Sequence, residues 1–290
     1  MTTDSISIIN PGRMFFGEVK HPAFELLRYT SPSLCLDIGA AAGIFTKLMR
    51  ARSPSSRVIA FEPFPGNHPF FERNIASDPQ VTLFKAAVTN ANGRVSFRVP
   101  STAKGDEPGW TNYEGYSSLG HVVDSEASAD ASLVESVALD ELIHEQVGFC
   151  KIDIQGGEYN ALVGSRRLLQ NGNIDMLLIE FGGEDAIIEL LSNSGYILVD
   201  TKYLLVCSRN SPDLIDWTSL TPINLSTGID AYQAWPVNLP MQSQEYCEWI
   251  RKRSRSLGGV WTDLLCIHRS FMPEFLRATA CLIEHSQTKI

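Results

Sequence analysis

From residue 34 onward, apolar runs typical of β-strands alternate with segments typical of α-helices. The runs are rich in Val, Ile, Leu and Phe, and helix-like segments such as GIFTKLMRARS and EDAIIELLSN separate most of them. This alternation predicts right-handed βαβ units, and so an α/β fold whose mostly parallel sheet is covered by helices on both faces. The expected strands lie at 34–39, 57–63, 81–88, 149–154, 174–181 and 196–201.

A first departure from this alternation follows the third strand. The run GRVSFRV at 93–99 comes without an intervening helix, and a polar stretch with several aromatic residues follows it. We therefore expect a lid-like loop at 101–136, and its small, acidic part at 124–136 is typical of loop.

A second departure lies near the C-terminus, where TDLLCIHRS at 262–270 predicts an antiparallel last strand. The residues before it, 202–261, have no helix-then-strand rhythm, and we expect them to form an insertion on the substrate side of the sheet. The chain is thus expected to form a single domain over 34–290, preceded by a helical or irregular extension at 1–33.

Composition narrows the possible environments and partners. The chain has 290 residues, 44% of them hydrophobic, and its 24 Lys and Arg against 33 Asp and Glu give a net charge of −9. That charge argues against unaided binding to nucleic acid or to an anionic membrane surface, and no apolar run approaches the length of a membrane span. Six cysteines without C-x-x-C spacing favour a reducing compartment and no zinc. We expect a soluble, cytoplasmic protein without a signal peptide.

The first expected strand ends in DIGAAAG, a compact turn of glycines and alanines. Such a turn lets backbone N–H groups approach a ligand at the positive end of a helix. Glu62 ends the next strand, about twenty residues further on, which is the spacing at which an acidic residue binds both ribose hydroxyls of an adenosine-type cofactor. The two motifs predict a nucleoside cofactor, and a packing turn with a surface glutamate is the alternative.

The same turn favours S-adenosylmethionine over a dinucleotide. Ala41 occupies the place of the glycine on which a pyrophosphate would rest, and Asp37 lies just before the turn. A carboxylate repels pyrophosphate but attracts a sulfonium cation and an amino group, and S-adenosylmethionine carries both. The chain also lacks the Y-x-x-x-K pair of short-chain dehydrogenases.

The stretch FCKIDIQGGEYNALVG places Lys151 and Asp153 in an otherwise apolar strand. Charges in such a run are costly unless they are paired or used. Both are expected on one side of the strand, near the carboxyl end at which open α/β sheets bind ligands. Gly156 and Gly157 predict a tight turn, and Glu158 opens the next helix, either as a cap or as a substrate contact. Asp153 is expected to reach the cleft, and a structural pair with Lys151 is the alternative.

In content and order these motifs resemble those of the FkbM-type S-adenosylmethionine-dependent methyltransferases. The resemblance covers roughly residues 34–200 and rests on LDIGAAAG, AFEP, KAAV, SSL, ALDEL, KIDIQGGE and LLIEF. It implies a Rossmann-like class I methyltransferase fold with a seven-stranded sheet. It also implies O-methylation of sugars, polyketides and related metabolites of secondary metabolism. The chain departs from the family pattern at Ala41, where asparagine is usual, and at Gln155, where glutamate is usual.

The resemblance also assigns roles to individual residues. It implies cofactor contacts by Asp37, Gly39, Ala40, Gly43, Glu62, Pro63, Ala87, Ser118 and Asp153. Lys151 and Glu158 match the family pattern as well, and Lys151 is expected beside Asp153 in the catalytic site.

Methyl transfer to an alcohol requires the acceptor oxygen to lie in line with the methyl group and to lose its proton. Asp153 is the candidate base, alone or helped by His121 from the expected lid. Alternatively, Asp153 and Glu180 at the ends of neighbouring strands could hold a divalent ion such as Mg²⁺, as in catechol-type O-methyltransferases. A hydrogen-bonded surface group is the competing interpretation of His121.

The acceptor has no motif of its own, and we expect a small hydroxylated molecule. The basic run RKRSR at 251–255 predicts either a solvated helix surface or a patch that guides an anionic or carrier-bound acceptor. The oligomeric state stays open. Two other functions compete with methyl transfer, namely an NAD-type oxidoreductase and a nucleoside-binding protein without catalysis.

Overall fold

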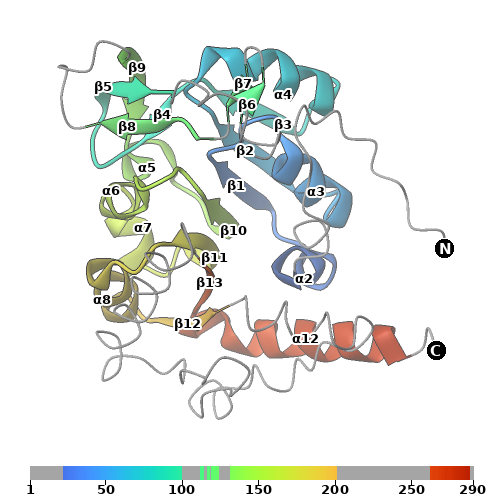
Figure 1. Cartoon of the computed structure of the whole chain (residues 1–290). Helices are drawn as coiled ribbons and strands as arrows, with labels where there is room; N and C mark the ends of the chain where they lie inside the picture. The colour runs from blue at the N-terminus through green and yellow to red at the C-terminus, as the bar shows by residue number, and fades with distance from the viewer. Residues whose placement is uncertain are drawn as a thin grey trace, which may run out of the picture.

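The structure, a computed structural model, describes residues 22–99, 112–113, 116–117, 119–123, 131–200 and 262–287 (Figure 1). Ser118, the expected insertion at 202–261 and the basic run at 251–255 lie outside the described residues. Every strand expected from the sequence has a counterpart in the part of the chain that is described.

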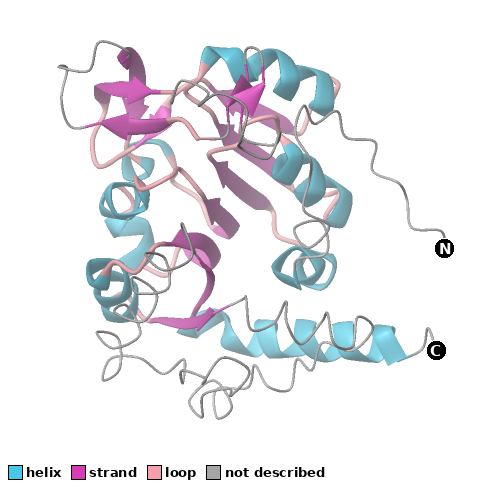
Figure 2. Cartoon of the chain, viewed as in Figure 1, coloured by secondary structure: helices cyan, strands magenta, loops and turns pink. Residues whose placement is uncertain are grey.

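The described residues form a central, seven-stranded sheet (Figure 2). In spatial order its strands are β12 (Tyr196–Asp200), β13 (Thr262–His268), β11 (Ile174–Phe181), β10 (Val147–Ile152), β1 (Leu34–Ile38), β2 (Arg57–Phe61) and β3 (Val81–Phe84). Neighbouring strands are parallel from β11 to β3, whereas β13 is antiparallel to both β11 and β12. The mostly parallel sheet and its antiparallel last strand confirm the prediction.

Helices cover both faces of this sheet, so its middle strands are buried on both sides (Figure 1). Every residue of β1 and β10 is buried, as their near-continuous apolar runs predict. One helical layer contains α2 (Pro22–Thr30), α3 (Ile44–Arg52), α4 (His68–Ile75) and α12 (Met272–Gln287). The other contains α5 (Leu139–Leu142), α6 (Glu158–Val163), α7 (Arg166–Gln170) and α8 (Asp185–Asn193). Within the described ranges, no helix is both long and apolar enough to cross a bilayer.

Helix α2 belongs to the main core. Phe24, Leu26 and Leu27 are fully buried, and the Phe24 ring stacks on Phe45 with centroids 5.3 Å apart. The described part of the expected N-terminal extension is therefore integral to the domain.

The order of the strands reverses between β1 and β10. The chain first places β1, β2 and β3 side by side and then returns to place β10 on the opposite edge of β1. Open α/β sheets bind ligands beyond the carboxyl ends of their strands at such a reversal. The turn after β10 is tied to β1 there, because the Asp153 amide donates to the Ile38 carbonyl at 3.1 Å.

A smaller sheet follows β3 along the chain. It contains, in spatial order, β4 (Ala87–Val88), β9 (Ala131–Val137), β5 (Gly93–Arg98) and β8 (His121–Val123). A separate short hairpin pairs β6 (Asn112–Tyr113) with β7 (Tyr116–Ser117).

The prediction of a loop at 101–136 is wrong for much of the described part, because β6, β7, β8 and most of β9 lie within these residues. In the β9 segment, residue type does not follow burial: Leu133 is 51% exposed, while Val134 and Ser136 are buried. Its sequence therefore lacks the apolar alternation that would predict a strand. The segment forms a strand because it pairs with every residue of β5 and because Val134 packs with Ala87 and Phe97 in a small core. These contacts are distant in sequence, so local patterning does not report them.

Candidate functional site

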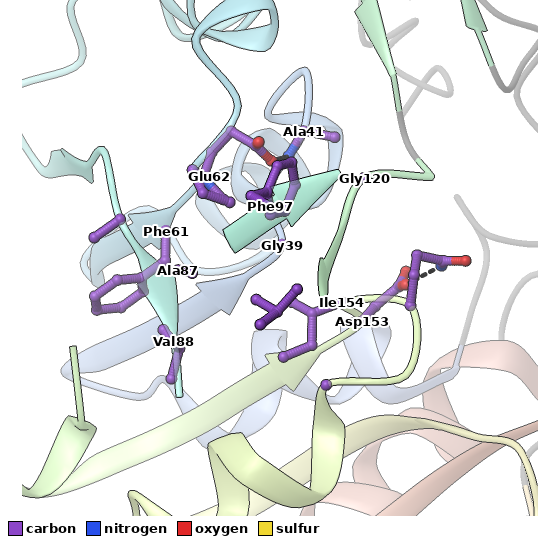
Figure 3. A pocket seen from close by; sticks show the side chains of 15 residues that line it. Gly39, Ala41, Phe61, Glu62, Ala87, Val88, Phe97, Gly120, Asp153 and Ile154 are labelled. Carbon is purple, nitrogen blue, oxygen red and sulfur yellow. Dashed lines mark hydrogen bonds between the residues drawn. The ribbon is translucent and has the colours of Figure 1, made fainter. Parts of the chain in front are cut away.

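A pocket lies at the reversal of strand order, between the turns after β1, β2 and β10 and the face of the smaller sheet (Figure 3). Five residues expected to contact a cofactor line it: Gly39, Glu62, Pro63, Ala87 and Asp153. The smaller sheet contributes Ala87, Val88, Phe97 and Val122, and the other lining residues are Ala41, Phe61, Ala86, Gly120, Ile154, Gln155 and Gly157. The motifs of the first, second and fourth strands therefore meet at one place.

Gly39 allows the turns after β1 and β10 to touch. Its φ is +82°, and a Cβ at this position would lie 1.9 Å from the backbone oxygen of Asp153. Ala41, two residues later, also adopts a left-handed conformation with a φ of +46°. Asparagine, usual here in the family pattern, enters this region more readily than alanine. The turn thus keeps its shape despite the alanine.

Glu62 lies at one end of the pocket and is only 4% exposed. Its carboxylate accepts a hydrogen bond of 2.8 Å from the backbone N–H of Ala41 (Figure 3) and another of 2.8 Å from the backbone N–H of Phe64. Burial raises its pKa to about 7, against the lowering effect of these hydrogen bonds. The Asn67 side chain also hydrogen-bonds this carboxyl group, so the Glu62 side chain is fixed in one orientation at the pocket wall.

Lys151 lies behind the pocket wall and joins two carboxylates. Its Nζ is 3.3 Å from Asp153 Oδ2 and 3.8 Å from Asp37 Oδ1, and it donates to the Gly39 carbonyl at 3.4 Å. The ammonium also lies 4.3 Å from the centroid of the Phe45 ring. Burial by itself would lower the pKa of Lys151, but Asp153 and Asp37 outweigh it and raise that pKa. Lys151 is a charged support for Asp153.

Three expected contact residues lie beneath the pocket wall. Asp37 is fully buried and accepts a hydrogen bond of 2.6 Å from Thr46, while its Oδ1 has no hydrogen-bond partner among the described residues. Burial raises the pKa of Asp37, opposed by Lys151. Ala40 is 3% exposed, and Gly43 packs its backbone against the Phe71 ring. These residues shape the turn and hold Lys151.

Asp153 reaches the pocket, as predicted, with its side chain 34% exposed. Gln155 Nε2 donates to Asp153 Oδ1 at 2.9 Å and to Glu180 Oε2 at 3.1 Å. Burial, reinforced by Asp153 and other nearby carboxylates, raises the pKa of Glu180 well above its usual range. The expected juxtaposition of Asp153 and Glu180 is present, but an amide lies between them.

Glu158, the first residue of α6, holds the turn that precedes the helix. Its carboxylate accepts hydrogen bonds from the backbone N–H of Ile154 at 2.9 Å and of Gly156 at 2.8 Å. Glu158 is 5% exposed, and burial raises its pKa to about 7. Of the two alternatives left by the sequence, the geometry favours the structural one.

His121 lies between two residues that line the pocket, Gly120 and Val122, so strand alternation directs its side chain away from the pocket. Its Nδ1 lies 3.1 Å from the Leu119 carbonyl oxygen and its Nε2 lies 3.4 Å from an Arg98 nitrogen. This environment matches the surface interpretation of His121.

No arrangement of the described residues supports Mg²⁺ at Asp153 and Glu180. The Gln155 amide, which is a hydrogen-bond donor, occupies the place between the carboxyl groups that a bridging ion would take. In the described ranges, no three or more His, Cys, Asp or Glu side chains are arranged to hold a metal ion.

Sequence reasoning did not assign Phe61, Phe97, Gly120 and Val122 to the pocket. The alternation in GRVSFRV carried a usable signal, because it directs Phe97 and Val95 to the same face. Gly120 and Val122 carried none, since their place depends on the pairing of β8 with β5.

A comparison with family models gives a match to the methyltransferase FkbM domain over residues 37–198. That span is more than half of the chain. The chain belongs to the FkbM methyltransferase domain family. The family match begins at Asp37 and ends within β12, so it includes every strand-end turn of the pocket. The architecture of this FkbM-family chain is the class I methyltransferase fold, with the seven-stranded sheet described above.

Similarities to individual proteins are more distant. The chain is 23% identical over 167 residues to the AMB antimetabolite synthetase AmbE of Pseudomonas aeruginosa, a match covering 46% of this chain and 8% of AmbE. The crystal structure of methyltransferase FkbM from Methylobacillus flagellatus KT is 17% identical with a TM-score of 0.41, covering 59% of this chain and 40% of that one.

A further structural neighbour is the O-methyltransferase from a trans-AT PKS multienzyme of Brevibacillus brevis, in complex with S-adenosyl-L-homocysteine. It is 8% identical with a TM-score of 0.39, covering 92% of this chain and 77% of that one. This chain therefore spans less than a tenth of AmbE and less than half of the Methylobacillus protein. At these TM-scores the family assignment rests on the family match.

Proposed function

We propose that this FkbM-family chain transfers a methyl group from S-adenosylmethionine to a hydroxyl group of a small metabolite. One observation carries the choice of cofactor: Glu62 and Asp153 line the pocket, whereas no Lys, Arg or His among the described residues does. Asp153, the carboxylate that is not assigned to the ribose, attracts the sulfonium and ammonium groups of S-adenosylmethionine. It would repel the pyrophosphate of NAD, which disfavours the oxidoreductase alternative.

The two ends of the pocket suit different parts of this cofactor. Glu62 is a fixed acceptor for the ribose hydroxyls, and the apolar residues nearby, Phe61 and Pro63 among them, offer a surface for the adenine. Asp153, on the far side of the Gly39 turn, is the acceptor for the cationic part. The cofactor, when bound, supplies an electrophilic methyl group.

The acceptor hydroxyl is expected beside Asp153. The Asp153 carboxylate is oriented by Lys151 and Gln155, so it can accept the hydroxyl proton as the oxygen attacks the methyl carbon and the carbon–sulfur bond breaks. The products are a methyl ether, S-adenosylhomocysteine and a proton on Asp153. Phe97 and Val122 add apolar side chains to the pocket lining.

The acceptor class and the setting are part of the proposal. The family resemblance favours sugars, polyketides and related metabolites as acceptors, free or bound to a carrier. Buried free thiols at Cys35, Cys150 and Cys266 agree with a reducing environment such as the cytoplasm.

A methyl-transfer screen tests the proposal. The chain, S-adenosylmethionine and a panel of hydroxylated metabolites would be incubated together, and both the methylated product and S-adenosylhomocysteine would be measured by mass spectrometry. We expect transfer to oxygen, and its loss in Asp153→Asn even at S-adenosylmethionine concentrations that saturate the variant. Transfer to nitrogen or carbon would contradict the O-methyl assignment, and full activity of the variant would remove Asp153 as the base.

A further inference from the structure

One side-chain amide joins carboxyl groups from two neighbouring strands. Gln155 Nε2 lies 2.9 Å from Oδ1 of Asp153, which follows β10, and 3.1 Å from Oε2 of Glu180, which is in β11. The dashed line beside Asp153 in Figure 3 marks the first of these hydrogen bonds. An amide NH₂ has two N–H donors, so one Gln155 side chain can satisfy both carboxyl groups.

The backbone directs Gln155 to this place. Its φ of +58° is left-handed, and Gly156 continues the turn with a φ of +100°. The Glu158 carboxylate accepts hydrogen bonds from the N–H groups on either side, those of Ile154 and Gly156. Gln155 is therefore held at the tip of a clamped turn, beside the pocket that it lines.

The two oxygens of Asp153 have different donors. Lys151 lies 3.3 Å from Oδ2, and Gln155 takes Oδ1. A neutral donor between Asp153 and Glu180 holds the pair together without a second positive charge. In many proteins a divalent cation holds two such carboxyl groups, using oxygen ligands.

We propose that the Gln155 amide takes the place of a divalent cation and is the positioning residue that orients Asp153 toward the pocket. Glutamate has the same length as glutamine, and Gln155→Glu would bring a third carboxyl group against Asp153 and Glu180. Three carboxyl groups form the oxygen-rich donor set that Mg²⁺, Mn²⁺ and Ca²⁺ prefer. One substitution should therefore convert the amide bridge into a metal site. This proposal does not depend on which cofactor the pocket binds.

The test compares thermal unfolding of the whole chain in chelator and in millimolar Mg²⁺, Mn²⁺ or Ca²⁺. Three forms are needed: the parent, Gln155→Glu, and Gln155→Met as a control of similar size without donors. We expect the parent to have the same melting temperature in chelator and in metal. Gln155→Met should melt several degrees lower in both. Gln155→Glu should melt lower in chelator and recover several degrees with metal.

Two results would overturn the proposal. Stabilisation of the parent by metal, lost in Asp153→Asn, would show that a cation already binds at Asp153 and Glu180. An unchanged melting temperature of Gln155→Met would show that the Gln155 amide does not hold Asp153 and Glu180 together.

If Gln155→Glu does not fold, a double-mutant cycle replaces it. Gln155→Met would be combined with Asp153→Asn and, separately, with Glu180→Gln, and the shifts in melting temperature compared. Shifts smaller in the double variants than the sum of the single ones are expected, because the side chains share one bridge. Additive shifts in both cycles would contradict a positioning role for Gln155.

Discussion

Glu62 and Asp153 line the same pocket, but the protein holds them in different ways. Glu62 is 4% exposed, and backbone N–H groups of Ala41 and Phe64 fix it at 2.8 Å. The side chain of Asp153 is 34% exposed and is held by two other side chains, Lys151 at 3.3 Å and Gln155 at 2.9 Å. One carboxylate is thus positioned by the fold itself and the other by a polar network.

This difference teaches how one pocket can use two carboxylates for two tasks. Backbone donors are neutral, so burial dominates and raises the pKa of Glu62 to about 7. Asp153 has a full counter-charge in Lys151, and it keeps one face open to the pocket. Glu62 therefore suits hydroxyl groups of a ligand, and Asp153 suits a cation or a transferred proton.

The largest expected effect tests the charged network behind Asp153. Lys151→Met should lower the free energy of unfolding by about 3–5 kcal/mol, because it leaves the carboxylate of Asp37 buried without its counter-charge. Urea denaturation measures the change. The matched control is Lys85→Met, whose side chain is 56% exposed beside Glu72 and should cost less than about 1 kcal/mol. Equal losses of unfolding free energy in the two variants would contradict the claim that the buried network stabilises the fold more than the surface pair does.

The pH dependence of stability tests the backbone-held carboxylate. In the folded protein the pKa of Glu62 is raised from 4.5 to about 7, so the folded state binds more protons between these values. The parent should therefore lose stability relative to Glu62→Gln as pH rises from 4.5 to 7, by on the order of 3 kcal/mol in total. Parallel stability curves for the two proteins over this range would show that burial does not control Glu62.

Ligand affinity separates the role of Glu62 from its effect on folding. Glu62→Ala should weaken the binding of S-adenosylhomocysteine about tenfold to a hundredfold, since charge-assisted hydrogen bonds to the ribose are lost. Isothermal calorimetry on the folded variant gives the affinity. Glu72→Ala, on the exposed surface of α4, is the control and should bind as the parent does. Unchanged affinity of Glu62→Ala would remove the ribose assignment.

The smallest expected effect concerns the apolar part of the pocket lining at Phe97 and Gly120. A Cβ on Gly120 would lie 2.4 Å from Cζ of Phe97, so Gly120→Ala must displace the ring and should cost about 1 kcal/mol of stability. Gly182→Ala is the control, because its Cβ would meet only the carboxylate of Glu184, at 3.1 Å. A weaker affinity for S-adenosylhomocysteine is expected in Gly120→Ala alone. If both variants bind equally, Phe97 does not shape the ligand site.

The central sheet was predictable because its strands carry their own signal. LCLDI and VGFCKI are apolar except for Asp37 and Lys151, and both strands are fully buried. The smaller sheet was predicted only in part, because β9 depends on pairing with β5 rather than on its own apolar residues. A local sequence pattern carries no information about pairing between strands that are distant in the chain.

The candidate site, like the fold, was predicted only in part. Glu62 and Asp153 were predicted to reach the pocket, because an acidic residue at the end of an apolar strand is costly to bury unless it is paired or binds a ligand. Asp37 was predicted as a contact but lies beneath the wall, held by Thr46 and near Lys151. The sequence marked Gln155 only as a departure from a pattern, because its partner Glu180 is 25 residues away.

The most direct test of the proposed function is a pair of calorimetric titrations of the unmodified chain, one with S-adenosylhomocysteine and one with NAD, in the same buffer. Because Asp153 would repel a pyrophosphate and no Lys, Arg or His among the described residues lines the pocket, we predict saturable binding of S-adenosylhomocysteine and no measurable binding of NAD. Binding of NAD without binding of S-adenosylhomocysteine would contradict the account.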